Sequence, residues 1–121
     1  MIMVTTLTSF EEERKRPPTH PGLILKADVL PALGVTQEQF ANLLGLSRKT
    51  VNEILGCKGS VTAQTAVKLG SLLGNSPMFW QNLQVTYDLW QAKRTLGFEE
   101  MERLREAHVN FLATGKFYFR G

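Results

Sequence analysis

A short run of basic, amide and hydroxyl side chains near the middle of the chain has the chemistry of a base-reading surface. Arginine and lysine can pair with the acceptor edge of guanine, and asparagine can pair with two atoms of adenine. A helix that enters the major groove of DNA reads bases with residues of its first two turns. Ser47 is a good helix N-cap, so the helix that it begins presents these groups in its first turns. We therefore expect base contacts from Ser47, Arg48, Lys49 and Asn52.

Contacts with phosphate groups are expected on both sides of this run. Gln37 falls in the first turn of the preceding helix, where free N–H groups and the helix dipole favour an anion. Thr50 lies at the flank of the base-reading helix, where it can touch a phosphate or a thymine methyl group. The remaining candidates for the DNA backbone are Lys58, Thr62 and Gln64.

The spacing of three small or branched residues predicts how this surface is held. Ala41 is small enough for two helix axes to approach closely, and Gly45 can adopt a left-handed turn without strain. Val51 then fills the wedge between the helices from the second one. The spacing Ala-x3-Gly-x5-Val, with Thr36 and Ser47 as caps, predicts a helix-turn-helix packed through these three residues.

Apolar residues recur at helical spacing through most of the chain, and no segment alternates with a period of two. A helix is expected from Pro21, with Leu23, Ile24, Ala27 and Leu30 on one side, and Pro31 to Gly34 should end it. Further helices are expected from Thr62 to Gly74, from Ser76-Pro77 onward and up to Gly115. The sequence therefore predicts an all-α fold.

The pattern divides the chain into three parts. Residues 1–19 carry a charged block that runs into two prolines, which favours a flexible N-terminal segment. Residues 20–94 are expected to form the DNA-binding and dimerisation domain, and residues 95–121 a C-terminal helical extension. The final GKFYFRG is either a docking element for a partner or a cover over the chain's own core.

The helix expected from Ser76-Pro77 onward carries more large apolar side chains than a small domain readily buries. Burial against a second copy accounts for them, although some can complete the core of one chain. A dimer would also place two base-reading helices about one DNA turn (~34 Å) apart. The expected dimer interface consists of Trp80, Leu83, Gln84, Tyr87 and Trp90.

Composition excludes several other classes. The 121 residues are 43% hydrophobic and 21% charged, with a net charge of +3, as in an ordinary globular domain. No apolar run is long enough to cross a membrane. At the N-terminus the basic residues follow the apolar stretch and do not precede it as in a signal peptide, so we expect a cytoplasmic protein. One cysteine, Cys57, excludes an internal disulfide, and redox sensing by it remains a minor hypothesis. No metal, cofactor, small-molecule substrate or catalytic constellation is expected.

Three segments together resemble the HigA family of antitoxins, also called VapI-like, among the helix-turn-helix regulators of the xenobiotic-response-element type. They are HPGLIL (20–25), TQEQFANLLGLSRKTVNEIL (36–55) and VTAQTAVKLGSLLGNSPMFWQNLQVTYDLWQA (61–92). The part from Ser76 to Ala92 is the most distinctive, because phage-repressor-like domains in general lack it. The chain departs from the family pattern at Leu23, where an acidic residue is usual, and at Gly56-Cys57-Lys58, where Asn-Gly-Lys/Arg is usual.

The resemblance implies a lambda-repressor-like domain of five to six helices and a homodimer that represses its own operon at a palindromic operator. It also implies a partner, a RelE-like (HigB-type) toxin that cleaves mRNA and is neutralised by the antitoxin of this type II module. Two alternatives stay open. One is an orphan regulator of the same fold with no toxin, and the other is a protein-interaction module that no longer binds DNA.

Overall fold

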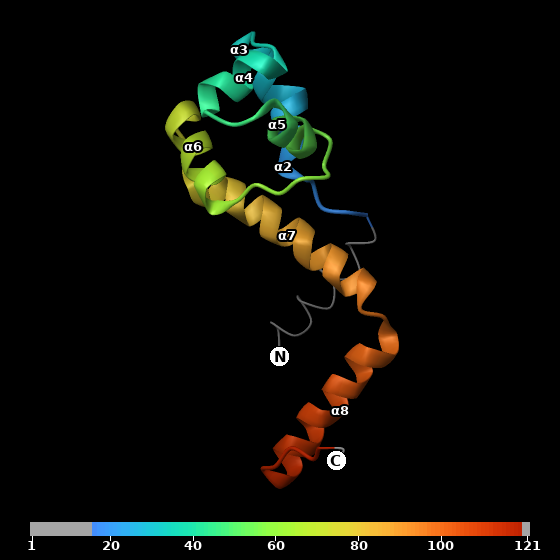
Figure 1. Cartoon of the computed structure of the whole chain (residues 1–121). Helices are drawn as coiled ribbons and strands as arrows, with labels where there is room; N and C mark the ends of the chain where they lie inside the picture. Colours follow the sequence, from blue (N-terminus) through green and yellow to red (C-terminus); the bar gives the residue numbers. More distant parts are fainter. Residues whose placement is uncertain (1–15, 120–121) are drawn as a thin grey trace. The chain divides into compact units, whose positions relative to one another are not determined.

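The computed structural model describes residues 16–119, and every regular element in this range is helical (Figure 1). The all-α prediction is therefore confirmed for this part of the chain. The expected flexible segment lies outside the described residues up to position 15, and residues 16–19 lead without a helix into the first element. No helix in the described range is both long and apolar enough to cross a membrane.

The first helical stretch has three parts: α2 (Pro21–Ile24), the π-helix η1 (Leu25–Val29) and α3 (Leu30–Leu33). The Leu30 N–H donates to the Leu25 carbonyl, five residues back, so the register shifts by one residue here. Leu25 and Leu30, five residues apart, both face the core. The expectation is therefore met for Leu30, but it is corrected for Leu23, which is 51% exposed, and for Ala27, which is exposed.

The stretch ends at Gly34, the last residue of the segment expected to end it, and it continues through Pro31. Pro31 occupies the first turn of α3, where a missing N–H costs little. The helix ends three residues later at Gly34, which has the left-handed φ of 68° that favours glycine.

The helix-turn-helix consists of α4 (Gln37–Leu44) and α5 (Arg48–Leu55). Thr36 forms the expected capping box: its side chain accepts from the Gln39 N–H, and the Gln39 side chain accepts from the Thr36 N–H. Gly45 ends α4 with a φ of 66°, and Ser47 caps α5, so both predicted boundaries are confirmed.

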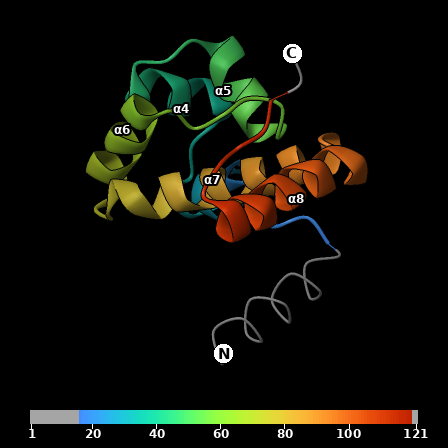
Figure 2. The ribbon, with the colours of Figure 1, turned by 90° about the horizontal axis from the view of Figure 1, so that it is seen from below.

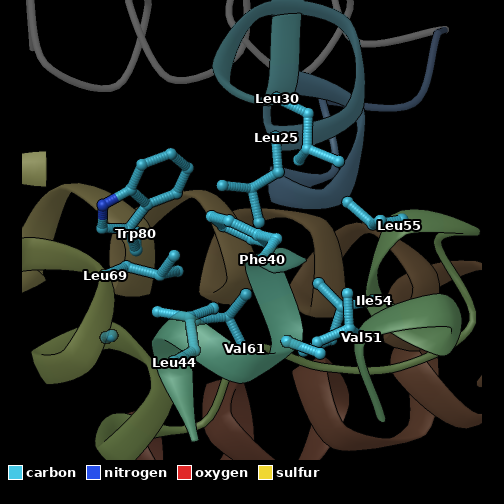
Figure 3. Packing of buried hydrophobic residues seen from close by; sticks show 12 residues of the cluster. Leu25, Leu30, Phe40, Leu44, Val51, Ile54, Leu55, Val61, Leu69 and Trp80 are labelled. Atoms are coloured by element: carbon cyan, nitrogen blue, oxygen red, sulfur yellow. The ribbon is translucent and has the colours of Figure 1, made fainter. Parts of the chain in front are cut away.

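Two further helices complete the first of two compact units, which extends to Asp88. They are α6 (Ala63–Leu73), capped by Thr62, and α7 (Pro77–Thr95). Figure 2 shows α4 between α5 and α6. The buried cluster, shown in Figure 3, takes side chains from all of these helices and from the loop after α5; the largest of its fully buried side chains are Trp80, Phe40, Leu25, Leu69 and Val61.

The second unit begins at Leu89 and contains the end of α7 and helix α8 (Phe98–Thr114). Gly115 ends α8 with a φ of 74°, as the sequence predicted. After it the chain turns back, and the Phe117 ring stacks on Phe111 with centroids 4.5 Å apart. No residue of α8 is buried in the described structure.

Candidate nucleic-acid interface

The start of α5 is fixed by Ser47. Its Oγ accepts a hydrogen bond from the Thr50 N–H at 3.1 Å and donates to the Thr50 Oγ1 at 2.9 Å. The cap places Arg48 at the first helical position, with Lys49 and Thr50 in the same turn. Positive charge is unfavourable at a helix N-terminus. The helix dipole therefore does not account for these two cations, whereas an external anion at this position would suit them.

The two faces of α5 differ completely in character. Val51, Ile54 and Leu55 are buried, whereas Arg48, Lys49, Thr50, Asn52 and Glu53 are exposed. On this face, Lys49 Nζ and Glu53 Oε1 form an exposed ion pair at 4.0 Å. An exposed pair of this kind contributes about 0.3–0.5 kcal/mol, so DNA can displace it easily. The exposed face of α5 is thus polar, and its Lys49–Glu53 pair can be replaced by contacts with DNA.

The turn before α5 is held tightly. Ala41 and Val51 are buried, as predicted, and the Leu46 N–H donates to the Ala41 carbonyl at 3.0 Å. Lys68 of α6 reaches back to this turn, with its Nζ 3.5 Å from the Gly45 carbonyl oxygen. No local sequence pattern signals this contact, because the two residues are 23 positions apart.

The five candidates for phosphate contact are all exposed. Gln37 is the first residue of α4, and Thr62 is the N-cap of α6, where its Oγ1 accepts from the Thr65 N–H at 3.2 Å. Gln64 follows in the first turn of α6. Two helix N-termini therefore carry hydroxyl or amide groups, which is the arrangement that suits a phosphate oxygen.

Lys58 lies in a well-ordered loop directly after α5. The Lys58 and Gly59 N–H groups both donate to the Glu53 carbonyl, at 2.9 and 2.8 Å. Cys57, just before them, has a φ of 62°, which is uncommon for a residue other than glycine. The loop backbone is thus tied to the last turn of α5, while the Lys58 side chain is free to extend outward.

His20 is a functional candidate that the sequence analysis missed. Its ring is 2% exposed, and it bonds at one nitrogen to the Gly22 N–H and at the other to the Gly59 carbonyl of the loop. Burial lowers the pKa of His20, and this outweighs the opposing effects of the Gly59 bond and the Asp88 charge. The His-Pro-Gly sequence before α2 signalled a helix start, but not this bond to a residue 39 positions away.

Two of the five expected dimer residues are in the chain's own interior. Trp80 is 1% exposed, and its indole N–H donates to Asn75 Oδ1 at 3.0 Å. Gln84 is 4% exposed: it accepts from the Val61 N–H at 2.8 Å and donates to Asp88 at 2.9 Å. Neither presents a surface to a second copy, so the expectation is corrected for both. Trp80 belongs to the hydrophobic core, and Gln84 turns inward to accept from Val61 in the loop before α6.

The other three expected dimer residues keep part of their surface. Leu83 packs partly on the core, and Tyr87 meets the His20 ring edge to face at 4.8 Å. Trp90, in the second unit, lies under the Arg94 guanidinium at 4.6 Å. Their role in a dimer stays a prediction.

Two short helices joined by a glycine turn, with an exposed polar face on the second, define a helix-turn-helix protein. Among the described residues, no three histidine, cysteine, aspartate or glutamate side chains are grouped so that they could hold a metal ion.

Comparison with known proteins identifies the family. No protein-family model matches the chain. Antitoxin HigA-1 of Vibrio cholerae is 39% identical over 79 residues, which are 65% of this chain and 74% of the relative. The solved structure of antitoxin GraA in complex with its operator is 38% identical, with a TM-score of 0.64, over 72% of this chain and 87% of that one. Pseudomonas aeruginosa antitoxin HigA with the higBA promoter is 34% identical, with a TM-score of 0.66, over 71% and 92%. The chain belongs to the HigA family of antitoxins, as the resemblance implied.

Proposed function

We propose that this chain is the antitoxin of a type II toxin–antitoxin module and represses its own operon by binding operator DNA through α5. The observation that carries the proposal is the exposed face of α5, where Arg48 and Asn52 stand one turn apart on a rigidly capped helix. Two of the similar solved structures contain an operator or promoter, which supports DNA as the ligand of this face. The chain then acts as a binding protein and not as an enzyme, in the cytoplasm where its operator lies.

In this proposal two copies bind a palindromic operator. Each inserts α5 into the major groove, with Arg48, Lys49 and Asn52 against base edges and Gln37, Lys58 and Thr62 against phosphates. The two helices are about one DNA turn apart (~34 Å), and the bound dimer blocks the promoter. The partner in the module is a RelE-like, HigB-type toxin that the antitoxin neutralises.

The proposed dimer forms through the exposed apolar surface of α7 in the first unit. Phe79 and Leu83, with Asn82 and Thr86, line one side of an open groove, and residues 16–19 line the other. Phe79 is 45% exposed even though it contacts the buried Trp80 ring edge to face. A second copy of the chain would cover this surface and bring two α5 helices onto one operator.

Binding of the full chain to its own upstream DNA, measured at several salt concentrations, tests the operator part of the proposal. Arg48→Ala should weaken operator binding by about 1–3 kcal/mol and relax base choice at one position in each half-site. Lys58→Ala should instead weaken operator and random DNA alike and flatten the salt dependence, because it removes a phosphate contact.

Lys26→Ala is the matched control, since it removes one exposed positive charge from η1, outside the proposed interface. It should leave operator affinity nearly unchanged. Equal losses for Arg48→Ala on operator and random DNA would contradict base reading by α5. Absence of any specific complex would contradict operator repression and favour an interaction module.

A further inference from the structure

His20 joins three parts of the molecule that are far apart in sequence. Its Nδ1 accepts from the Gly22 N–H at 2.9 Å and so caps α2. Its Nε2 lies 3.0 Å from the carbonyl oxygen of Gly59, in the loop after α5. Its ring packs edge to face on Tyr87 of α7, with an angle of 85° between the planes. A single buried imidazole thus links the first helix, the loop after the base-reading helix and α7.

These contacts require one protonation state and one tautomer. The Gly22 N–H can only donate, so Nδ1 carries a lone pair, and the Gly59 carbonyl can only accept, so Nε2 carries the proton. The neutral ring satisfies both partners. Protonation would place a second N–H at Nδ1, facing the Gly22 N–H, and the cap would be lost.

The two backbone segments that His20 joins, at Gly22 and at Gly59, lie directly against the base-reading helix α5. A Cβ atom on Gly22 would be 1.8 Å from the Ile54 carbonyl oxygen in the last turn of α5, so the two backbones are in contact. Gly59 also lies close to α5, because a Cβ atom there would be 3.0 Å from the Glu53 Cβ. Neither backbone can shift without disturbing the end of α5 and the loop that carries Lys58.

We propose that His20 is the positioning residue of the loop 56–60: its neutral ring holds this loop and the end of α5 in the DNA-binding arrangement, and protonation releases them. The inference rests on the operator binding proposed above and adds a regulator of it, the proton. Operator affinity should therefore fall as the solution becomes acidic. That sign is opposite to the effect of simply adding positive charge to a DNA-binding protein, which strengthens binding.

Burial, and not the surrounding charge, favours the neutral form of the His20 ring. The titratable groups on the neighbouring elements are Asp88 and Tyr87 on α7, Cys57 and Lys58 in the loop and Glu53 on α5, and α2 has none. Of these, Asp88 acts on the ring, and it raises the pKa, but burial has the larger and opposite effect. The Asp88 carboxylate also accepts a hydrogen bond from the Gln84 side chain.

The test measures operator affinity of the full chain from about pH 7.5 down to about pH 4.5, which extends below the ordinary histidine range because burial lowers the pKa of His20. His108→Gln is the matched control, since His108 is the only other histidine, is exposed and lies in α8. The unmodified chain and His108→Gln should both lose at least about fivefold in affinity on acidification, as expected for a broken buried hydrogen bond. His20→Gln should bind more weakly at pH 7.5 and show no such loss.

Nitrogen NMR and amide exchange on the same unmodified chain keep the test independent of whether His20→Gln folds. The spectrum should show a proton on Nε2 and none on Nδ1 at pH 7.5, and exchange at residues 58–60 should speed up as His20 titrates. An identical pH profile for the unmodified chain and a folded His20→Gln, or unchanged exchange in the loop, would overturn the proposal. Absence of operator binding at pH 7.5 would instead contradict the proposed function, while the NMR result would still decide the role of His20.

Discussion

Side chains of the same type have opposite roles in this chain, depending on where the fold places them. The amides of Asn52 and Gln84 illustrate this: Asn52 stays exposed on α5, whereas Gln84 is enclosed and bonds to Val61 and Asp88. A buried amide of this kind is needed because the Val61 N–H is removed from water and otherwise has no partner there. Gln84 is therefore a stability residue, and Asn52 is a candidate for DNA recognition.

Replacing Gln84 with leucine should lower the free energy of unfolding by about 1–3 kcal/mol, because it leaves the buried Val61 N–H without an acceptor. Urea unfolding followed by circular dichroism measures the change. Gln64→Leu, the same substitution at an exposed position of α6, should change stability by less than about 0.5 kcal/mol. Equal stability of the two variants would show that the Gln84 bonds contribute little.

At the scale of elements, most helix boundaries follow from residues at the boundaries themselves. Thr36, Ser47 and Thr62 each accept a hydrogen bond from the N–H three residues later, and glycine ends α4 and α6 with a positive φ. The exception is η1, where the π register could not be seen in a pattern based on 3.6 residues per turn. Helix α7 shows a second limit of the sequence pattern. One face of this helix is buried in the core and another is exposed, and the pattern did not tell the two faces apart.

The exposed face of α7 gives the prediction for self-association. Phe79→Glu should raise the dissociation constant of the dimer at least about tenfold, because it removes a large apolar side chain and adds a charge. Sedimentation equilibrium on the full chain measures this constant. Leu43→Glu, a charge placed at a 56% exposed leucine of α4, should leave it unchanged. A monomer for the unmodified chain, or a dimer that Phe79→Glu does not weaken, would contradict this interface.

At the scale of the whole molecule, the chain combines a helix-turn-helix unit up to Asp88 with a second unit from Leu89. The likeness to the curated HigA relative covers 79 residues, which is less than the whole chain. Helix α8 has acidic residues in its first turn and no buried residue in the described structure. Under the proposed function, we expect DNA recognition to be separable from toxin neutralisation, because the residues assigned to DNA all lie in the first unit.

The toxin half of the proposal predicts such a separation. Expression of the adjacent toxin reading frame alone should arrest growth, and co-expression of this chain should restore it fully. Arg48→Ala should restore growth equally well, because Arg48 lies on the exposed face of α5 that is assigned to DNA. Growth curves and a pull-down of the tagged toxin measure both effects. An adjacent product without toxicity, or toxicity that this chain does not relieve, would favour the orphan regulator.

The sequence by itself determined the features that depend on neighbouring residues. These are the all-α class, the caps at Thr36, Ser47 and Thr62, the glycine turn at Gly45 and the inward packing of Ala41 and Val51. Each depends on the preference of one side chain for a local backbone geometry, so a one-dimensional pattern contains it. The family followed from the same segments.

Only the tertiary structure decided which side of a helix meets which distant segment. It turned Trp80 and Gln84 inward, it brought Lys68 to the Gly45 turn, and it enclosed His20 against Gly59. These contacts join residues separated by tens of positions. Burial of apolar surface drives the packing, and the polar groups that it encloses must then find hydrogen-bond partners. No local pattern records such partners, because they exist only once the core has formed around them.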